Sequence, residues 1–486
     1  MYGTVSRWLA WAALCAAVAV GLCPPRALGN VLQVTKTADT NDGSCTPVDC
    51  SLREALDAAN SGDTIMIPAG TYTLGSPLVI VTDVTLQGVG AGDTIIQAAA
   101  APGIAGYNVF VISVSTQVAL NDLTIRHGAA IGGAGSGGAI FCTGSGTLAI
   151  TRCNIVFNEV NADGAMNGGA ASGGALFVSG VSLVITDSVI ANNQATANGG
   201  TGNGGAVSGG AIFADQTTII RSSVENNQAT ANSPTAFAGA VAGGALFTGE
   251  TTIESSTVAN NRALALGGTA GGAVSGGAVF SGPLTLRNST VSSNAADGSA
   301  VSGGALFSLV DASNSTIVDT HGKGGAVFGT LTARNTILAN NALRNCSSLK
   351  SDGYNLVDVD ENCTITPAAG DQIGTAAMPI NPRLGPLNDN GGPTLTHALL
   401  RSSTAIDGGN PGGCTDENGD PILLDQRGVP RTLDGNLDGI PVCDIGAYEF
   451  RGTSPTAPVL DRLALAALAA VLLVLGARQL ARARRN

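Results

Sequence analysis

Ser136-Gly-Gly-Ala-Ile-Phe141 is the stretch that decides the fold, because the same pattern returns six more times along the chain. Each copy places Gly-Gly-Ala before an aliphatic residue and a phenylalanine. Seven of the eleven phenylalanines stand at this one position: Phe141, Phe177, Phe213, Phe247, Phe280, Phe307 and Phe328. A motif that returns at intervals of 20–50 residues predicts a solenoid, in which each copy contributes one coil.

Asparagines form a second column of the repeat. They are paired in four copies, as Asn192-Asn193, Asn226-Asn227, Asn260-Asn261 and Asn340-Asn341. Aliphatic residues stand eight and three positions before the second asparagine, for example Ile219 and Val224. A separation of five would aim these two side chains at opposite faces of one straight strand, so a polar corner must lie between two strands. Because stacked coils place like residues about 4.8 Å apart, we expect an internal phenylalanine ladder and coil-to-coil hydrogen bonds between asparagines.

The spacing of the phenylalanines shows which part of the coil varies. The interval falls from 36 residues in the first copies to 21 in the last. The surplus lies in Gly/Ala/Asn-rich segments such as 195–208 and 229–242, which we expect to be loops on one face of the solenoid. A disordered tract would not hold Phe and Ile in register. The sequence therefore predicts an all-β parallel solenoid of ten to twelve coils.

The charge balance excludes one class of partner. Residues 30–457 carry 16 Lys and Arg against 34 Asp and Glu, a net charge of −18. A nucleic-acid partner is excluded, because no basic patch is available to follow phosphates. An acidic chain favours cations, Ca²⁺ among them.

The cysteines fit an exported protein. Residues 1–29 have the features of a secretory signal peptide, with Arg7 before an apolar stretch at 9–22. The eight cysteines that remain after its removal fall into local pairs, and we expect disulfides on grounds of proximity. The expected pairs are Cys45/Cys50, Cys142/Cys153, Cys346/Cys363 and Cys414/Cys443.

One helix is predicted, over residues 50–60. Ser51 and Glu54 have the spacing of a capping box, and Leu52, Ala55 and Leu56 form an apolar stripe. Such a helix can cover the open end of the first coil, as capping units of solenoids do.

Three segments resemble known families. The segment CSLREALDAAN at 50–60 resembles the CSLREA segment that opens many exported right-handed parallel β-helix proteins of the pectin-lyase-like fold. The repeat is similar to the GGA[ILV] half of the repeats in polymorphic membrane protein adhesins. Residues 351–450, which end in CDIGAYEF, resemble the choice-of-anchor Q domain. These resemblances imply right-handed coiling and surface display, with no defined reaction.

The resulting division of the chain has five parts. We expect a signal peptide at 1–29, a CSLREA-type cap at 30–62, the parallel β-helix at 63–345, a choice-of-anchor Q-like module at 346–452 and a tail at 453–486. The tail holds 15 apolar residues at 463–477 before a basic end, which predicts a membrane helix with its basic end inside. It resembles the PEP-CTERM and IPTL-CTERM sorting signals, and a plain membrane anchor is the alternative. The chain is therefore expected at the cell surface, or released after processing of the tail.

Catalytic candidates are few. The best constellation is carried by the shortest coil and consists of Asp311, Asp319, His321 and Lys323. β-Helix lyases and hydrolases use Asp clusters, a metal or paired carboxylates together with an Arg, Lys or His, and the acids of the other coils do not recur in register. The alternative is that these four are corner side chains without a catalytic role.

A metal candidate lies near the C-terminus. Asp434, Asn436 and Asp438 place oxygen ligands at alternate positions before Gly439, as in the first half of a Ca²⁺ loop. The closing Glu is absent, and the alternative is an Asx/Gly turn held by the Cys414/Cys443 pair. Ca²⁺ is the one cofactor that the sequence suggests.

The sequence favours a structural or adhesive role at the cell surface, with a polysaccharide or another surface as partner. The alternative is a polysaccharide lyase or glycoside hydrolase, because the pectin-lyase-like fold hosts many of them.

Overall fold

The computed structural model describes residues 29–114, 117–268 and 271–452. The predicted signal peptide, apart from Gly29, and the predicted membrane helix at 463–477 lie outside the described residues. Within them, none of the helices has the length and apolar character that a bilayer span requires.

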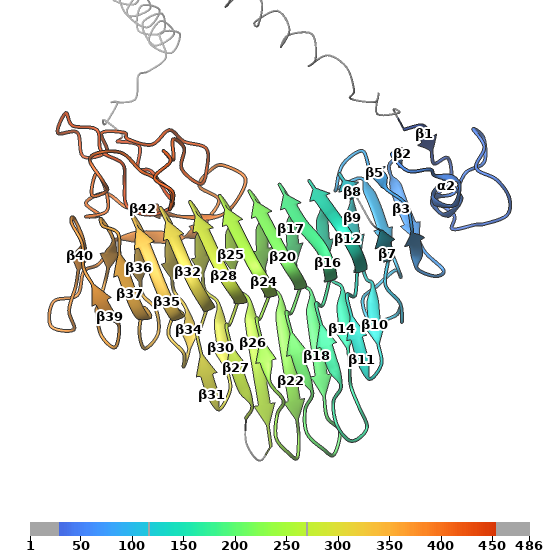
Figure 1. The fold of residues 1–486 in the computed structure, drawn as a ribbon, viewed down its shortest axis with the longest axis horizontal. Coiled ribbons are helices and arrows are strands. Elements are labelled where there is room, and N and C mark those ends of the chain that lie inside the picture. The colour runs from blue at the N-terminus through green and yellow to red at the C-terminus, as the bar shows by residue number, and fades with distance from the viewer. Residues whose placement is uncertain (1–28, 115–116, 269–270, 453–486) are drawn as a thin grey trace, which may run out of the picture.

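Two long parallel sheets form the body of the molecule (Figure 1). Sheet A contains β1 (Val31–Gln33), β2 (Asp63–Met66), β5 (Val84–Gln87), β8 (Gln117–Asn121), β12 (Ile140–Thr151), β16 (Leu176–Thr186), β20 (Ile212–Ile220), β24 (Leu246–Glu254), β28 (Val279–Arg287), β32 (Leu306–Ser313), β35 (Val327–Arg334), β37 (Cys346–Ser351) and β39 (Thr364–Thr366), with β4 (Leu78–Ile80) and β7 (Phe110–Val114) beside β12. Sheet B contains β3 (Gly70–Thr73), β6 (Thr94–Gln97), β9 (Thr124–Arg126), β13 (Asn154–Val156), β17 (Val189–Ala191), β21 (Ser223–Glu225), β25 (Thr257–Ala259), β29 (Thr290–Ser292), β33 (Thr316–Val318), β36 (Ile337–Ala339), β38 (Leu356–Val357) and β40 (Gln372–Ile373).

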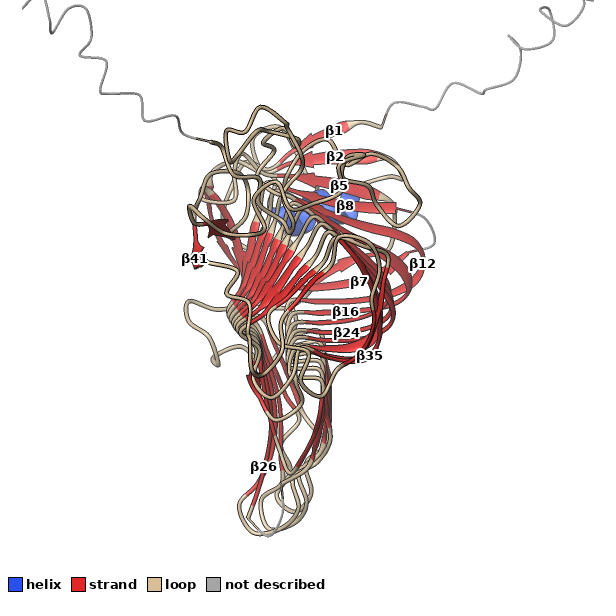
Figure 2. Ribbon diagram, turned by 90° about the vertical axis from the view of Figure 1, so that its left-hand side faces the viewer, coloured by secondary structure: helices blue, strands red, loops and turns tan. Residues whose placement is uncertain are grey.

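Two smaller parallel sheets project from this body as a thin fin (Figure 2). Sheet C contains β10 (Ala129–Ile131), β14 (Glu159–Asn161), β18 (Gln194–Asn198), β22 (Gln228–Ser233), β26 (Arg262–Gly267), β30 (Ala295–Asp297) and β34 (His321–Gly322). Sheet D contains β11 (Ala134–Ser136), β15 (Ala170–Ser172), β19 (Ala206–Ser208), β23 (Val241–Ala242), β27 (Ala273–Ser275) and β31 (Ala300–Ser302).

In each sheet the order of the strands follows the order of the chain, and every coil pairs with the next in parallel. This arrangement is a parallel β-helix, as the repeat predicts. The twelve strands of sheet B agree with the expected ten to twelve coils. Strand pairing continues to β40, so the coils extend past residue 345, where the sequence placed the start of the C-terminal module.

The two aliphatic columns predicted from the repeat are confirmed. Ile185 pairs with Ile219 in sheet A, and Ile190 pairs with Val224 in sheet B. All four side chains are fully buried. The polar corner between the sheets turns through residues with positive φ, such as Arg221 at φ 45°.

The asparagine column is confirmed as an internal ladder. The backbone N–H and the side-chain amide of Asn193 both donate to Oδ1 of Asn227, over 3.0 and 3.1 Å. Asn227 makes the same two bonds to Asn261. These bonds satisfy buried polar groups at the corner that leaves sheet B, and they fix the coil register.

The phenylalanine ladder exists, but the expectation that it is internal was wrong. The seven rings stack in single file with centroid distances of 4.9–5.2 Å. Each ring is half-buried on the outer face of sheet A, while the aliphatic residue before it, such as Ile212, points inward. Adjacent residues of a strand face opposite sides, so only one of the two can enter the core.

The Gly/Ala/Asn-rich segments are also ordered, where loops were expected. They form the strands of sheets C and D, and between these lies a small core of alanines and valines, including Ala195, Ala229 and Val241. In the described connections between sheets C and D, such as 199–205 and 234–240, the chain turns without regular strands at the tip of the fin (Figure 2).

The predicted helix forms as α2 (Leu52–Ala58) with the capping box of Ser51 and Glu54 complete. Leu52, Ala55 and Leu56 join the coil core at its N-terminal end, as a cap should.

Three of the four expected disulfides form: Cys45–Cys50, Cys346–Cys363 and Cys414–Cys443. The expected Cys142–Cys153 bond was wrong, because both cysteines are free and buried. They lie near opposite ends of β12, whose backbone rises about 3.3 Å per residue, whereas a disulfide needs Cα atoms within about 7 Å. Burial raises the pKa of the Cys142 thiol to about 11 and that of Cys153 to about 12.

The C-terminal module, residues 374–452, packs on the outer face of sheet B over its last coils (Figure 1). It contains one antiparallel pair, β41 (Leu384–Asn388) with β42 (Thr396–Leu399). The Gln426 amide donates to Thr257 Oγ1 over 2.9 Å, and Thr290 Oγ1 donates to Gln426 Oε1 over 2.6 Å. Ile337 and Ile445 share one apolar cluster between module and coil.

Candidate functional site

The four catalytic candidates are distributed over β32, the corner after β33, and β34 with the residues beside it. Asp311 lies on β32 with Arg334 Nη1 3.6 Å from its carboxylate, and burial raises its pKa. Asp319 lies at a corner, 3.7 Å from His397 Nε2 of the module. His321 and Lys323 lie in and beside β34. Within the described residues, no hydrogen bond or ion pair joins any two of the four.

The metal candidate loop is held by its own backbone. Asp434 accepts hydrogen bonds from the N–H groups of Asp438 and Gly439, and Asn436 Oδ1 accepts from Asp438 N–H over 2.8 Å. Asp438 Oδ1 accepts from the N–H of Ile440. These are consecutive Asx turns, which is the alternative that the sequence left open. Binding of Ca²⁺ at this loop stays a prediction.

An acidic cluster that sequence reasoning missed lies at the N-terminal cap. The carboxylate oxygens of Asp42, Asp49 and Glu54 lie within 4.8 Å of one another. Lys36 fills the centre of the cluster, with Nζ 3.6 Å from Asp42, 3.5 Å from Glu54 and in contact with Asp49. Backbone hydrogen bonds from Ser51 and Asp42 lower the pKa of Glu54 to about 2. The lysine ammonium supplies the charge that a metal ion would otherwise supply.

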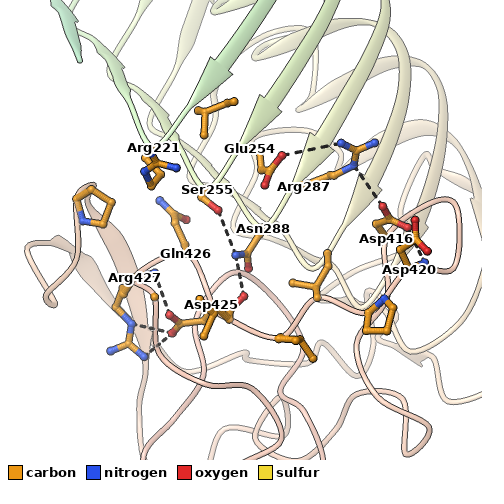
Figure 3. A pocket seen from close by; sticks show the side chains of 17 residues that line it. Arg221, Glu254, Ser255, Arg287, Asn288, Asp416, Asp420, Asp425, Gln426 and Arg427 are labelled. Carbon is orange, nitrogen blue, oxygen red and sulfur yellow. Dashed lines mark hydrogen bonds and ion pairs between the residues drawn. The ribbon is translucent and has the colours of Figure 1, made fainter. Parts of the chain in front are cut away.

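A cavity of about 560 Å³ lies at the seam between coils and module (Figure 3). We call it the seam cavity. The ends of β20, β24 and β28 and the corners after them form one wall, and the module segment 416–428 forms the other. Its lining residues are Ile220, Arg221, Glu254, Ser255, Arg287, Asn288, Pro393, Asp416, Asp420, Pro421, Ile422, Leu423, Leu424, Asp425, Gln426, Arg427 and Gly428.

The arginines of the seam cavity are each held by a carboxylate. Arg221 makes two 2.7 Å hydrogen bonds to Asp187 of the preceding coil. Arg427 makes hydrogen bonds of 2.8 and 2.6 Å to Asp425. The bidentate pair with Asp187 fixes the plane of the Arg221 guanidinium and leaves its Nη1 free to meet a ligand, whereas Arg427 also donates to the carbonyls of Asn390 and Glu449.

Arg287 bridges the two walls. Its guanidinium binds Glu417 through two nitrogens, one of them Nε at 2.8 Å, and this bond lowers the pKa of Glu417. Asp416 and Glu254 lie 3.8 and 3.9 Å from the same guanidinium (Figure 3). The seam therefore depends on one coil arginine for its main electrostatic contact.

A buried ion cluster supports the module wall. Arg431 is buried, donates to Asn288 Oδ1 over 2.5 Å and lies 3.5 Å from Glu449. Burial raises the pKa of Asp444 to about 8 and also raises that of Glu449. The cluster contains two arginines, Arg431 and Arg427, and three acids, Asp425, Asp444 and Glu449. If one of these acids keeps its proton, the positive and negative charges of the cluster are equal in number. All five residues belong to the segments DQRGVPR at 425–431 and CDIGAYEF at 443–450. The sequence of these two segments does not show that their side chains pack together in the fold.

Comparison of the sequence with protein-family models and with curated proteins finds no match. The resemblances to the CSLREA segment and the choice-of-anchor Q domain stay predictions. Among solved structures, the pectate lyase Pel9A aligns over 86% of this chain and 96% of its own, with 13% identity and a TM-score of 0.40.

Two further structures align less well. The catalytic domain of Agl-KA has 15% identity over 72% of this chain and 69% of its own, with a TM-score of 0.32. A pectin methylesterase mutant bound to a hexasaccharide has 13% identity over 52% of this chain and 78% of its own, with a TM-score of 0.28. At these TM-scores the neighbours carry no argument about activity, and the β-helix assignment rests on the strand pairing.

Proposed function

We propose that this chain is an exported, surface-displayed β-helix that binds glycans at the seam cavity without cleaving them. The observation that carries the proposal is the seam cavity itself. Its volume lies within the range of about 300–1,000 Å³ that is typical of ligand sites. Its walls combine guanidinium, carboxylate and amide groups with Pro393, Pro421 and Leu423, which suits the mixed polar and apolar surface of a sugar.

The state of the acids favours binding over cleavage. Glycoside hydrolysis needs two carboxyl groups, about 5–10 Å apart on either side of one bond, with separate acid and base roles. Asp311 faces Arg334 and Asp319 faces His397, in different parts of the coil. The hydrolase alternative therefore has no such pair among the candidates that the sequence offered.

Export and anchoring are supported by the sequence of the two ends. The apolar stretch at 9–22 and the apolar segment at 463–477 with its basic end are the features that motivate surface display. Three disulfides fit an oxidising compartment. Because the module that forms one wall of the cavity directly precedes this tail, the anchor would hold the seam cavity close to the membrane.

The test compares two matched arginine variants on a glycan array. Arg221 lines the cavity, whereas Arg152 occupies the same corner position two coils earlier and makes the same bidentate pair, with Asp122. We expect Arg221→Ala to lose glycan retention and Arg152→Ala to keep it. Incubation with pectin, alginate and chondroitin should release no new ends. Release of unsaturated or reducing ends that disappears in Asp311→Asn or Asp319→Asn would overturn the proposal in favour of the enzyme alternative.

A further inference from the structure

The charge balance of the seam cavity indicates which glycans it accepts. Each lining arginine is already paired with a carboxylate, Arg221 with Asp187, Arg287 with Glu417 and Arg427 with Asp425. Three lining carboxylates remain: Glu254, Asp416 and Asp420. Two of these share Arg287 at 3.8 and 3.9 Å, beyond hydrogen-bond distance, and in the described part of the chain none of the three pairs with a cation of its own. The cavity therefore carries an excess of negative charge.

The surroundings do not offset this excess. The chain between residues 30 and 457 has a net charge of −18. An excess of one sign of charge in a concave site favours ligands of the other sign and disfavours those of its own. An uronate polymer, which carries one carboxylate per sugar, is thus disfavoured at the seam.

A metal ion does not fit the same three carboxylates. Among the described residues, only Asp42, Asp49 and Glu54 bring three ligand atoms within 4.8 Å of one another. Glu254, Asp416 and Asp420 are spread along the cavity, Glu254 on the coil wall and the two aspartates on the module wall (Figure 3). Spaced carboxylates instead suit an extended ligand that carries several positive charges.

The remaining polar groups favour a sugar over a basic peptide. The Ser255 hydroxyl and the free Nη1 of Arg221 lie beside the carboxylates and offer both donors and acceptors, whereas the Asn288 amide is buried and bonded to Leu424 and Arg431. Hydroxyl groups use both kinds of partner, whereas a lysine ammonium uses acceptors alone.

We propose that the seam cavity binds an amine-bearing glycan, a chain containing unacetylated glucosamine, with Glu254 and Asp420 as the residues that hold its ammonium groups. This inference rests on the proposed function, since it names the ligand class of the same site.

The test measures binding of four probes to the purified full-length protein by calorimetry at mildly acidic pH, where sugar amines are protonated. The probes are a glucosamine tetramer, its fully N-acetylated counterpart, a galacturonate tetramer and pentalysine. We expect the glucosamine tetramer to bind about tenfold more tightly than the acetylated one, with an affinity that falls as salt rises.

The double variant Glu254→Gln/Asp420→Asn should lower affinity for the glucosamine tetramer about tenfold and leave that for the acetylated tetramer unchanged. Glu250→Gln is the matched control, because Glu250 is exposed on the same strand β24 outside the cavity. If the double variant does not fold, the salt dependence of the native protein decides the question.

The outcomes separate the two proposals. Equal or tighter binding of the acetylated or galacturonate tetramer would keep the glycan-binding function and overturn the amine assignment. Equal binding of pentalysine would show that charge alone is recognised, and the glycan assignment would fail. Absence of binding by all three glycans would overturn both.

Discussion

The coil body and the fin obey the same strand pairing but enclose different side chains. Sheets A and B enclose isoleucine, leucine and valine, as in the column of Ile185, Ile219 and Ile253. Sheets C and D enclose mostly alanine, as in the column of Ala197, Ala231 and Ala265. The body is wide and the fin is thin (Figure 2). The register between neighbouring coils is thus the same in both regions. The distance between the two facing sheets differs, because the size of the enclosed side chains sets it.

We expect the largest loss of stability for a substitution in the core of the coil body, between sheets A and B. Ile219→Ala removes a fully buried side chain between Ile185 and Ile253, and we expect a loss of about 3–4 kcal/mol in the free energy of unfolding. Chemical denaturation followed by circular dichroism measures it. Thr218→Ala, on the outer face of the same strand, is the control and should cost less than about 1 kcal/mol. Equal losses for the two variants would contradict the wide apolar core.

In the fin, we expect added volume, where the coil body suffers from removed volume, to be destabilising. Ala231→Leu adds volume between two closely spaced sheets, and we expect a destabilisation of about 2–3 kcal/mol from overpacking. Hydrogen exchange should show the loss of protection confined to the fin. Thr230→Leu is the control, since Leu264 already occupies the outward column one coil further on. An unchanged free energy of unfolding in Ala231→Leu would contradict close packing between sheets C and D.

The smallest effect concerns the outer ladder. Phe213 stacks on Phe177 at 4.9 Å and on Phe247 at 5.2 Å, yet it is half-buried. Phe213→Ala should therefore cost about 1–2 kcal/mol, mainly from the two stacked pairs, against about 3–5 kcal/mol for a phenylalanine in the core. Thermal or chemical denaturation distinguishes these ranges, and a cost near the upper one would place the ring inside after all.

Two residues, Asp215 and Gln216, explain why the sequence did not predict that the phenylalanine ladder lies on the outer face of sheet A. Alternation counted back from the inward Ile219 places Phe213 inside as well. In β20, however, Asp215 and Gln216 are both exposed, one after the other, between the inward Ala214 and Thr217. This irregularity reverses the alternation and turns Phe213 outward. Bulges of this kind leave no clear mark in a sequence rich in small polar residues.

The repeat predicted the coil well because its large aliphatic residues must be buried and its asparagines need hydrogen-bond partners at the corners. The fin was missed because alanine and glycine have low strand propensity and give no alternation to read. The seam cavity was missed for another reason. It needs the module to fold back on coils that precede it by more than a hundred residues, as Gln426 does on Thr257, and no local pattern encodes such a return.

The described contacts that line the seam involve the coils from β16 onward, as with Asp187, which holds Arg221, and with Asn288 and Thr290, which bond to the module. Tandem duplication or loss of a turn near the N-terminal cap would therefore change the reach of the molecule and leave its binding end intact. Coil number and recognition are separately adjustable in this architecture, because coils added at the N-terminal end leave the residues that line the cavity unchanged.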